Sequence, residues 1–299
     1  RFRLACRVTV QTSIQVKEME RIKEALERAR EERAGAGSSG GQPRARSDAS
    51  RPVAVAPDEI EYTQTRVIPL DSARLVERRI VAHLPAHPAA DAYRVLRTQV
   101  LRRMTDNGWS TLMVTSPTEG NGKTLTAINL AISMAREVNH TVLLVDFDLR
   151  RPTIGGFFSD APMPGISDHL LHRQPLSEML FNPSIERLVV LPGHEALADS
   201  SSERLSSPQV VELVEEIKNR YPARIIIFDL PPLLQFDDVL AFSPYVDAAL
   251  LVVEEGATTD LQLRRSHELL QNVNLCGVVL NKSREESSAY GSGYGYAHG

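Results

Sequence analysis

The chain contains very little cysteine and no long apolar run. Cys6 and Cys276 are its only cysteines, and they lie far apart with no metal-ligand spacing. A disulfide framework and a cysteine-based metal site are therefore excluded, and the composition is typical of a reducing compartment. No stretch of about 18 apolar residues occurs, so no transmembrane helix is predicted. Because Arg1, Arg3 and Arg7 interrupt the beginning of the sequence, no secretory signal is predicted either, and we expect a cytoplasmic protein.

The chain also lacks an excess of positive charge. Its formal net charge is −4, which argues against general nucleic-acid binding, so we expect no nucleic-acid partner. The hydrophobic fraction of 42% is ordinary for a globular protein. A length of 299 residues suffices for one large α/β domain with an appendage, or for two small domains.

The first 34 residues are interpreted as an N-terminal helical segment. A charged amphipathic helix begins at Met19, with Glu, Lys and Arg side chains at spacings of three and four residues. The first residue is Arg rather than Met. We therefore interpret Met19 as the native start, with residues 1–18 as upstream sequence or the result of a truncation.

Two weakly patterned segments follow. Residues 35–57 are rich in Gly, Ser, Ala, Pro and Arg and contain almost no large apolar side chain, which predicts a flexible linker. Residues 58–90 contain a few apolar positions with weak periodicity. We expect them to form an extended lead-in with a short helix near Ser72–Ala82.

Residues 91–284 alternate between apolar strand patterns and amphipathic helix patterns. Such alternation predicts an α/β domain of the P-loop NTPase type, in which helices cover both faces of a mostly parallel sheet. The expected strands are Thr111–Ser116, Thr141–Asp146, Leu188–Leu191, Arg224–Asp229, Ala248–Val253 and Leu275–Asn281. The expected helices are Asp91–Thr105, Lys123–Glu137, Pro208–Arg220 and Thr259–Asn272.

The segment from Ser116 to Thr124 matches the phosphate-binding loop pattern G-x-x-x-x-G-K-[ST], except that Pro117 replaces the first glycine. In such a loop, glycines allow close approach of the main chain, the lysine reaches the β- and γ-phosphates, and the hydroxyl ligates Mg²⁺. The alternative is a chance turn, which the apolar strand before it and the long helix after it disfavour. The predicted nucleotide-binding residues in the loop are Gly120, Asn121, Gly122, Lys123, Thr124 and Leu125.

Acidic residues end two of the expected strands. Asp146 and Asp148 lie at alternate positions of one strand end, so both carboxylates are expected to point the same way. Two facing acids require a cation or a proton between them, whereas the alternative is an ordinary solvated turn. Asp229 ends another apolar strand and is placed to hold Mg²⁺. Arg150 follows the first pair and could either pair with the acids or contact phosphate.

With these three segments, the sequence resembles the bacterial tyrosine kinase family of capsular and exopolysaccharide loci, especially the cytoplasmic autokinases of exosortase-associated (PEP-CTERM) loci. The resemblance runs from about residue 91 to 282 and rests on the phosphate loop, on D-x-D-x-R at residues 146–150 and on D-x-x-P at residues 229–232. It implies ATP and Mg²⁺ as cofactors and a catalytic set of Lys123, Asp146, Asp148 and Arg150. It also implies Mg²⁺ ligands at Thr124, Asp148 and Asp229, and an adenine contact at Asn281.

The same resemblance implies assembly and a phosphoacceptor. The family assembles through an E-x-x-R-x-x-R helix, which Asp91, Arg94 and Arg97 match with Asp in place of Glu; the alternative is an ordinary solvated face. The family also ends in a tyrosine cluster that a neighbouring subunit phosphorylates. Residues 285–299 are expected to be a flexible tail of this kind. Its three acceptors would be Tyr290, Tyr294 and Tyr296, unless the tail is a plain low-complexity segment.

The leading hypothesis is therefore an ATP-dependent protein-tyrosine autokinase that regulates exopolysaccharide polymerisation or export. A membrane co-polymerase would serve as its activator and would place it peripherally at the inner membrane. One alternative is a switch ATPase of the ParA/MinD type, which Thr118 disfavours because it stands where those proteins carry a signature lysine. The other alternative is a nucleotide-binding scaffold without kinase activity.

Overall fold

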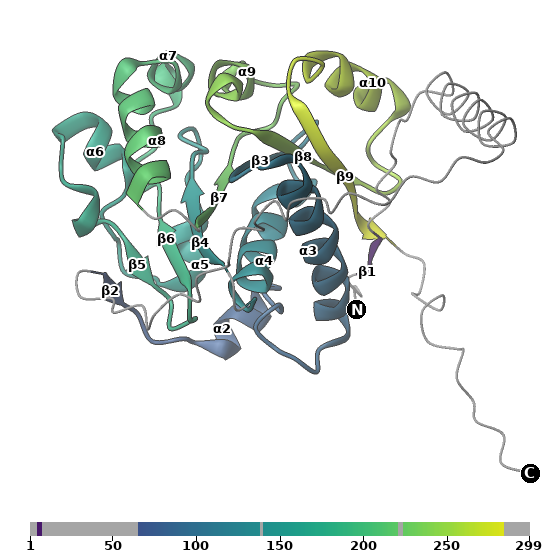
Figure 1. The fold of residues 1–299 in the computed structure, drawn as a ribbon, viewed down its shortest axis with the longest axis horizontal. Coiled ribbons are helices and arrows are strands. Elements are labelled where there is room, and N and C mark those ends of the chain that lie inside the picture. Colours follow the sequence, from purple (N-terminus) through teal and green to yellow (C-terminus); the bar gives the residue numbers. More distant parts are fainter. Residues whose placement is uncertain (1–4, 8–64, 138–139, 221–223, 284–299) are drawn as a thin grey trace, which may run out of the picture. The chain divides into compact units, whose positions relative to one another are not determined.

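The computed structural model describes residues 5–7, 65–137, 140–220 and 224–283. The strands in this described part form one sheet in the order β1-β9-β8-β3-β7-β4-β6-β5-β2 (Figure 1). Their bounds are β1 Ala5–Arg7, β2 Arg66–Val67, β3 Thr111–Thr115, β4 Thr141–Asp146, β5 Phe181–Asn182, β6 Leu188–Leu191, β7 Arg224–Asp229, β8 Ala248–Glu254 and β9 Asn274–Ser283.

The centre of the sheet is parallel. β9, β8, β3, β7, β4 and β6 all pair in parallel, whereas β5 on β6 and β1 on β9 are antiparallel. The central strands are buried along their length, as expected when helices cover both faces. This confirms the predicted P-loop NTPase-type fold.

Helices form one layer on each face of the sheet (Figure 1). Alternate residues of β3 divide between the two layers: Leu112 and Val114 pack with α3 and α4, whereas Met113 packs with α6, α8 and α9. The bounds are α2 Ser72–Glu77, α3 Pro88–Asn107, α4 Lys123–Ala135, α5 Ile154–Phe158, α6 Ile166–His172, α7 Ser201–Leu205, α8 Pro208–Arg220, α9 Asp238–Phe242 and α10 Asp260–Leu269.

Helix α3 begins earlier than its apolar periodicity predicts. The His87 ring nitrogen accepts a hydrogen bond from the amide of Ala89, and Pro88 occupies the first helical turn. Proline suits that position because its fixed φ is already helical and its missing N–H would have no partner there. Gly108 ends the helix with a φ of 68°, a conformation that glycine adopts without steric cost.

The lead-in packs against the same core as α3. The predicted helix near Ser72–Ala82 ends at Glu77, but Leu75, Ile80 and Val81 are buried beside α3 and α4. The buried amide oxygen of Asn129 accepts hydrogen bonds from the backbone of Val81 and Ala82. The packed body therefore includes residues upstream of Asp91.

Several predicted segments lie outside the described residues. These are most of residues 1–34, the linker at 35–57 and the tail with Tyr290, Tyr294 and Tyr296. All elements given above belong to one compact unit made of residues 1–10 and 57–299; a second unit, residues 11–56, is not described. Among the residues that are described, no helix has both the length and the apolar character needed to cross a membrane.

Candidate functional site

The loop between β3 and α4 depends on its glycines. Gly120 and Gly122 have φ angles of 81° and 91°, which side chains disfavour. A Cβ added to Gly122 would lie 2.1 Å from Nδ2 of Asn281, so space as well as conformation requires glycine there. The loop leads directly into the first turn of α4, where backbone N–H groups have no intrahelical partner.

Side-chain amides hold this loop in place. Oδ1 of the buried Asn121 accepts hydrogen bonds of 3.1 Å from both the backbone and the hydroxyl of Thr118. Asn281, at the end of β9, donates from Nδ2 to the Asn121 carbonyl across 2.8 Å, and its Oδ1 accepts from the Lys282 amide. Asn281 therefore fixes the loop backbone, and the adenine contact expected of it stays a prediction.

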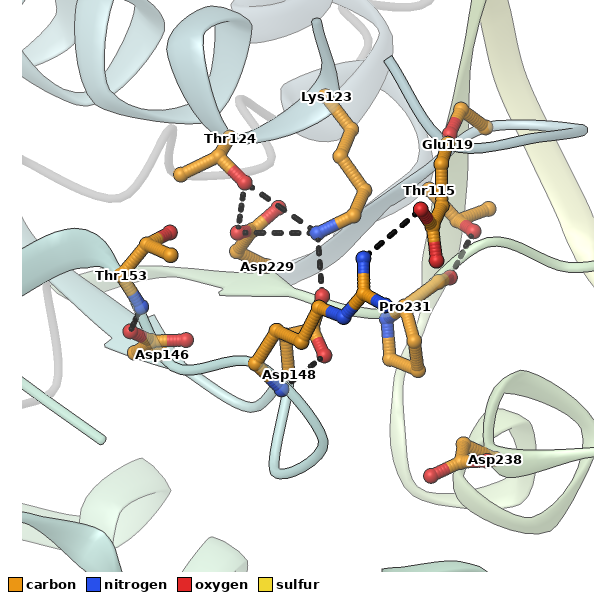
Figure 2. Close-up of polar contacts among 12 residues, drawn as sticks. Thr115, Glu119, Lys123, Thr124, Asp146, Asp148, Thr153, Asp229, Pro231 and Asp238 are labelled. Carbon is orange, nitrogen blue, oxygen red and sulfur yellow. Dashed lines mark hydrogen bonds and ion pairs between the residues drawn. The ribbon is translucent and has the colours of Figure 1, made fainter. Parts of the chain in front are cut away.

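Lys123 brings three elements together. Its Nζ lies 2.8 Å from Oδ2 of Asp148, 3.4 Å from Oδ2 of Asp229 and 3.2 Å from Oγ1 of Thr124 (Figure 2). The Thr124 hydroxyl also donates to Oδ2 of Asp229 across 2.6 Å. Because β4 pairs with β7 so that Asp146 lies opposite Asp229, the acids of both strands reach the helix that the loop opens.

The two acids of the D-x-D motif have different partners. Asp148 contacts Lys123, whereas Oδ2 of Asp146 accepts hydrogen bonds of 2.8 Å from the amides of Thr153 and Ile154 (Figure 2). Both carboxylates were expected to point the same way, but they contact different parts of the site. Asp148 lies beyond the end of the strand, where the alternation of side chains no longer applies.

Burial shifts the protonation equilibria of the site. Burial, followed by the charge of Asp229, raises the pKa of Asp146 to about 8. Burial also raises the pKa of Asp229 to about 6, although Lys123 and Thr124 oppose the shift. Burial alone would lower the pKa of Lys123, but the charges of Asp229 and Asp148 outweigh it and the pKa is raised. Lys123 therefore stays an ammonium group.

The donor set fits a magnesium–nucleotide complex. Oδ1 of Asp146 and Oδ1 of Asp229 are buried and have no hydrogen-bond partner in the described part of the chain. Orphaned carboxylate oxygens of this kind are suited to a cation or to a bound water. Within the described residues, no three His, Cys, Asp or Glu side chains form a metal-binding group. Mg²⁺ needs no such group, because phosphates and water supply most of its ligands.

Arg150 has a different environment from the one predicted. Its Nε lies 2.8 Å from Oδ2 of Asp238, Nη1 donates to the Ala198 carbonyl, and its guanidinium lies 4.3 Å from the ring centre of Phe236. Asp238 is completely buried and also accepts a short hydrogen bond from Ser201. Arg150 therefore joins the D-x-D strand end to α9 and to the turn before α7, a contact set that gives no support to a direct catalytic role.

Sequence reasoning missed the surroundings of Asp146. A Cβ on Gly193 would lie 2.1 Å from Cβ of Pro152 and 3.3 Å from Oδ2 of Asp146. The backbone at Gly193 therefore packs closely against one side of the Asp146 carboxylate. The neighbouring His194 has a φ of 80° and bonds Asp168 through Nδ1 at 2.8 Å. The Pro192-Gly193 pair directly after the apolar strand β6 was the signal that could have identified this loop.

The predicted assembly residues do not share one free face. Arg94 pairs with Asp91 on the same helix and donates to the Pro85 carbonyl. Arg97 instead packs against α4, where it bonds the Ser133 carbonyl at 3.2 Å and Glu137 at 2.8 Å. Its side chain is only 17% exposed, so Arg97 already has partners within one chain. Assembly through these residues stays a prediction.

Comparisons with known proteins agree with this geometry. Residues 111–272 match the model of an AAA domain family. The tyrosine-protein kinase YwqD of Bacillus subtilis is 30% identical over 220 residues, which cover 72% of this chain and 91% of that protein. EpsB of Ralstonia solanacearum is 32% identical over 232 residues, which cover 74% of this chain but only 29% of that much longer protein.

Solved structures show the same fold. The kinase domain of the Escherichia coli tyrosine kinase ETK superposes with a TM-score of 0.64 at 27% sequence identity. That match covers 77% of this chain and 94% of the kinase domain. The likeness thus extends through the strands that carry the candidate site.

Proposed function

The chain belongs to the bacterial tyrosine-protein kinase family, and on this premise we propose that it is an ATP-dependent protein-tyrosine autokinase. It would transfer the γ-phosphoryl group of MgATP to tyrosines of its own C-terminal tail, namely Tyr290, Tyr294 and Tyr296. Many of the proposed roles follow the family resemblance, and the arrangement of the site supports them.

One observation carries the proposal. The ammonium group of Lys123 and the hydroxyl of Thr124 lie within hydrogen-bonding distance of Asp229, and Lys123 also contacts Asp148. These residues come from the start of α4 and from the ends of β4 and β7. Phosphoryl transfer needs little covalent chemistry from a protein, since positioning and charge neutralisation supply most of the rate enhancement.

Each side chain has a role that suits its place. Lys123 would bind the β- and γ-phosphates, with the amides of Gly120–Leu125 around them. Thr124, Asp148 and Asp229 would hold the metal, directly or through water. Bound Mg²⁺ supplies neutralisation of the charge that develops on the phosphates. The loop residue Thr118 bonds Asn121 and provides no lysine of the switch-ATPase type.

Asp146 is the proposed proton acceptor. Its Oδ2 is held by two backbone amides, which leaves the buried Oδ1 for the phenolic proton. In the transfer, the tyrosine oxygen forms a bond to the γ-phosphorus while the bond between that phosphorus and the bridging oxygen of ADP breaks. In the chain alone, burial and the charge of Asp229 raise the pKa of Asp146 to about 8. With Mg²⁺ bound nearby, that pKa would fall and the carboxylate would be ionised, so that it can accept the phenolic proton.

The cellular role follows from the family. We propose that phosphorylation of the tail regulates exopolysaccharide polymerisation or export, and that a membrane co-polymerase is the activator and the means of recruitment. Homo-oligomer formation through Asp91, Arg94 and Arg97 would bring the tail of one subunit to the site of another. A phosphorylated tail carries added negative charge, which would favour its release from that site.

An in-vitro phosphotyrosine assay tests the proposal. Purified chain, alone and with a candidate membrane co-polymerase, is incubated with MgATP, and the modified tyrosines are mapped by mass spectrometry. We expect phosphate on the three tail tyrosines. Lys123→Met should abolish the signal, because methionine offers the phosphates neither a positive charge nor a hydrogen-bond donor.

Lys218→Met is the matched control. Lys218 lies on α8 and donates to the Tyr245 carbonyl, so its loss should leave transfer unchanged. Absence of phosphotyrosine in the wild type with its partner, but with ATP hydrolysis, would favour a switch ATPase. Nucleotide binding without either reaction would favour a scaffold.

A further inference from the structure

Helix α2 packs beside α5 (Figure 1), and Arg74 of α2 makes several hydrogen bonds to it. Its Nε donates to the Phe157 carbonyl at 3.2 Å, and its Nη2 donates to the Gly156 carbonyl at 2.8 Å. Nη2 also lies 2.5 Å from Oδ1 of Asp160, directly after the helix. Only 15% of the Arg74 side chain is exposed. One guanidinium thus holds the C-terminal end of α5.

The helix that carries Arg74 is itself well anchored. Asp71 caps α2 by accepting from the Arg74 amide at 3.0 Å, and Leu75 is buried in the core. Arg78, one turn later, donates to the Gly156 carbonyl at 2.7 Å. Helix α2 is therefore fixed in place and can hold α5 in position.

The opposite end of α5 holds Asp146. The amides of Thr153 and Ile154, at the start of the helix, each donate to Oδ2 of Asp146 across 2.8 Å. Because α5 has only five residues, it spans roughly 7 Å at about 1.5 Å per residue. A displacement at its C-terminal end therefore reaches the two amides that orient the carboxylate.

We propose that Arg74 is a positioning residue for Asp146, acting through α5. This inference rests on the proposed function, in which Asp146 receives the phenolic proton. Arg74 touches no reacting atom. Arg74 holds the Gly156 and Phe157 carbonyls and thereby keeps the amides at the start of α5 hydrogen-bonded to Oδ2 of Asp146. The orientation of Oδ1 is then fixed. The lead-in helix is then a part of the active-site architecture.

Backbone hydrogen exchange tests the link without any assay of activity. In Arg74→Ala, we expect the Thr153 and Ile154 amides to exchange at least about tenfold faster, because the helix that carries them is no longer held against Asp146. The Thr126 amide, which bonds the Gly122 carbonyl in α4, should be unchanged. Unaltered exchange at Thr153 and Ile154 would overturn the proposal.

Milder variants guard against a general loss of folding. Arg74→Lys keeps a positive charge beside Asp160 but cannot donate to both carbonyls in the geometry of the guanidinium, so intermediate exchange is expected. Asp160→Asn removes only the ion pairs with Arg74 and Arg78, whose shared carboxylate is 80% exposed, and it should resemble the wild type. Arg264→Ala, which removes an exposed pair with Asp260 on α10, is the matched control.

Kinetics distinguish positioning from a purely structural role. For Arg74→Lys, we expect kcat of tyrosine phosphorylation to fall about tenfold, since small misplacements of catalytic groups are costly. KM for the tyrosine substrate and Kd for MgATP should stay within about twofold of wild type. Faster exchange with an unchanged kcat would overturn the positioning role. If the wild type transfers no phosphoryl group, the proposed function fails, whereas the exchange data still decide whether Arg74 holds the amides.

Discussion

The side-chain amide of Asn281 donates a hydrogen bond of 2.8 Å to the main-chain carbonyl of Asn121, and this bond joins the end of β9 to the phosphate loop. The same side chain occupies the space into which a Cβ of residue 122 would project. A residue expected to contact adenine therefore also supports the segment that would bind the phosphates. The two roles make different predictions.

The first prediction concerns Asn281→Ala. Loss of the bond leaves the Asn121 carbonyl without its partner, at a cost of about 1–2 kcal/mol, or roughly tenfold in affinity. If the residue acts through the loop, binding of ATP and of inorganic triphosphate should weaken equally, as measured by calorimetry with Mg²⁺. Weakening of ATP alone would instead assign Asn281 to the adenine. Asn274→Ala, at the other end of β9, is the control.

The second prediction concerns the buried pair of Arg150 and Asp238. Arg150→Ala removes the partner of a completely buried carboxylate, so we expect a loss of about 3–5 kcal/mol in the free energy of unfolding. MgATP affinity should be retained, because the guanidinium contacts α9 and the turn before α7 rather than the phosphate loop. Urea denaturation and calorimetry provide the two measurements.

The neighbouring Arg151 provides the comparison for that experiment. Its side chain is 71% exposed and pairs with Glu119, so Arg151→Ala should cost less than about 1 kcal/mol. Equal destabilisation by the two variants would contradict the structural role of Arg150. A normal stability of Arg150→Ala with lost phosphoryl transfer would restore its predicted catalytic role.

The third prediction is a pH dependence at Asp247. Burial alone would raise the pKa of this carboxyl, but hydrogen bonds from the Ser110 amide and from the amide and hydroxyl of Thr111 outweigh it and hold the pKa below its usual value. A carboxyl with a lowered pKa in the folded state stabilises the protein above its unfolded pKa, near 3.9, and this contribution disappears as the pH falls through the folded value.

Asp247→Asn should therefore be less stable than the wild type at neutral pH, by about 1–3 kcal/mol. The difference should shrink as the pH falls below about 4, because the wild-type carboxyl then also becomes neutral. Urea denaturation of both proteins across this range is the measurement. A difference that stays constant with pH would show that the charge of Asp247 does not contribute.

Much of the fold could be predicted because its central strands have continuously apolar interiors. Thr141–Asp146, Leu188–Leu191 and Arg224–Asp229 have the bounds expected from sequence, and so does α8. Burial on both faces leaves a continuous apolar pattern that local reasoning can detect. The phosphate loop was equally visible, because Gly120, Gly122 and Lys123 have a fixed spacing between a strand and a helix.

The parts that could not be predicted depend on distant contacts. Helix α5 contains two glycines in five residues, so local propensity does not favour it, and the contacts from Arg74 and Asp146 stabilise it instead. The orientation of Arg97 depends on where α4 lies, which the spacing of charges on α3 does not reveal. Arg150 was assigned from its motif alone, and the motif contains no information about the buried Asp238.

The in-register pairing of Asp146 with Asp229 also limits where the sequence can tolerate insertions and deletions. A single residue inserted or deleted within Thr141–Asp146 or Arg224–Asp229 would turn the terminal carboxylate to the opposite side of the sheet. Length variation among natural homologues should therefore be confined to the connections between elements, and the distance from strand start to acid should be invariant.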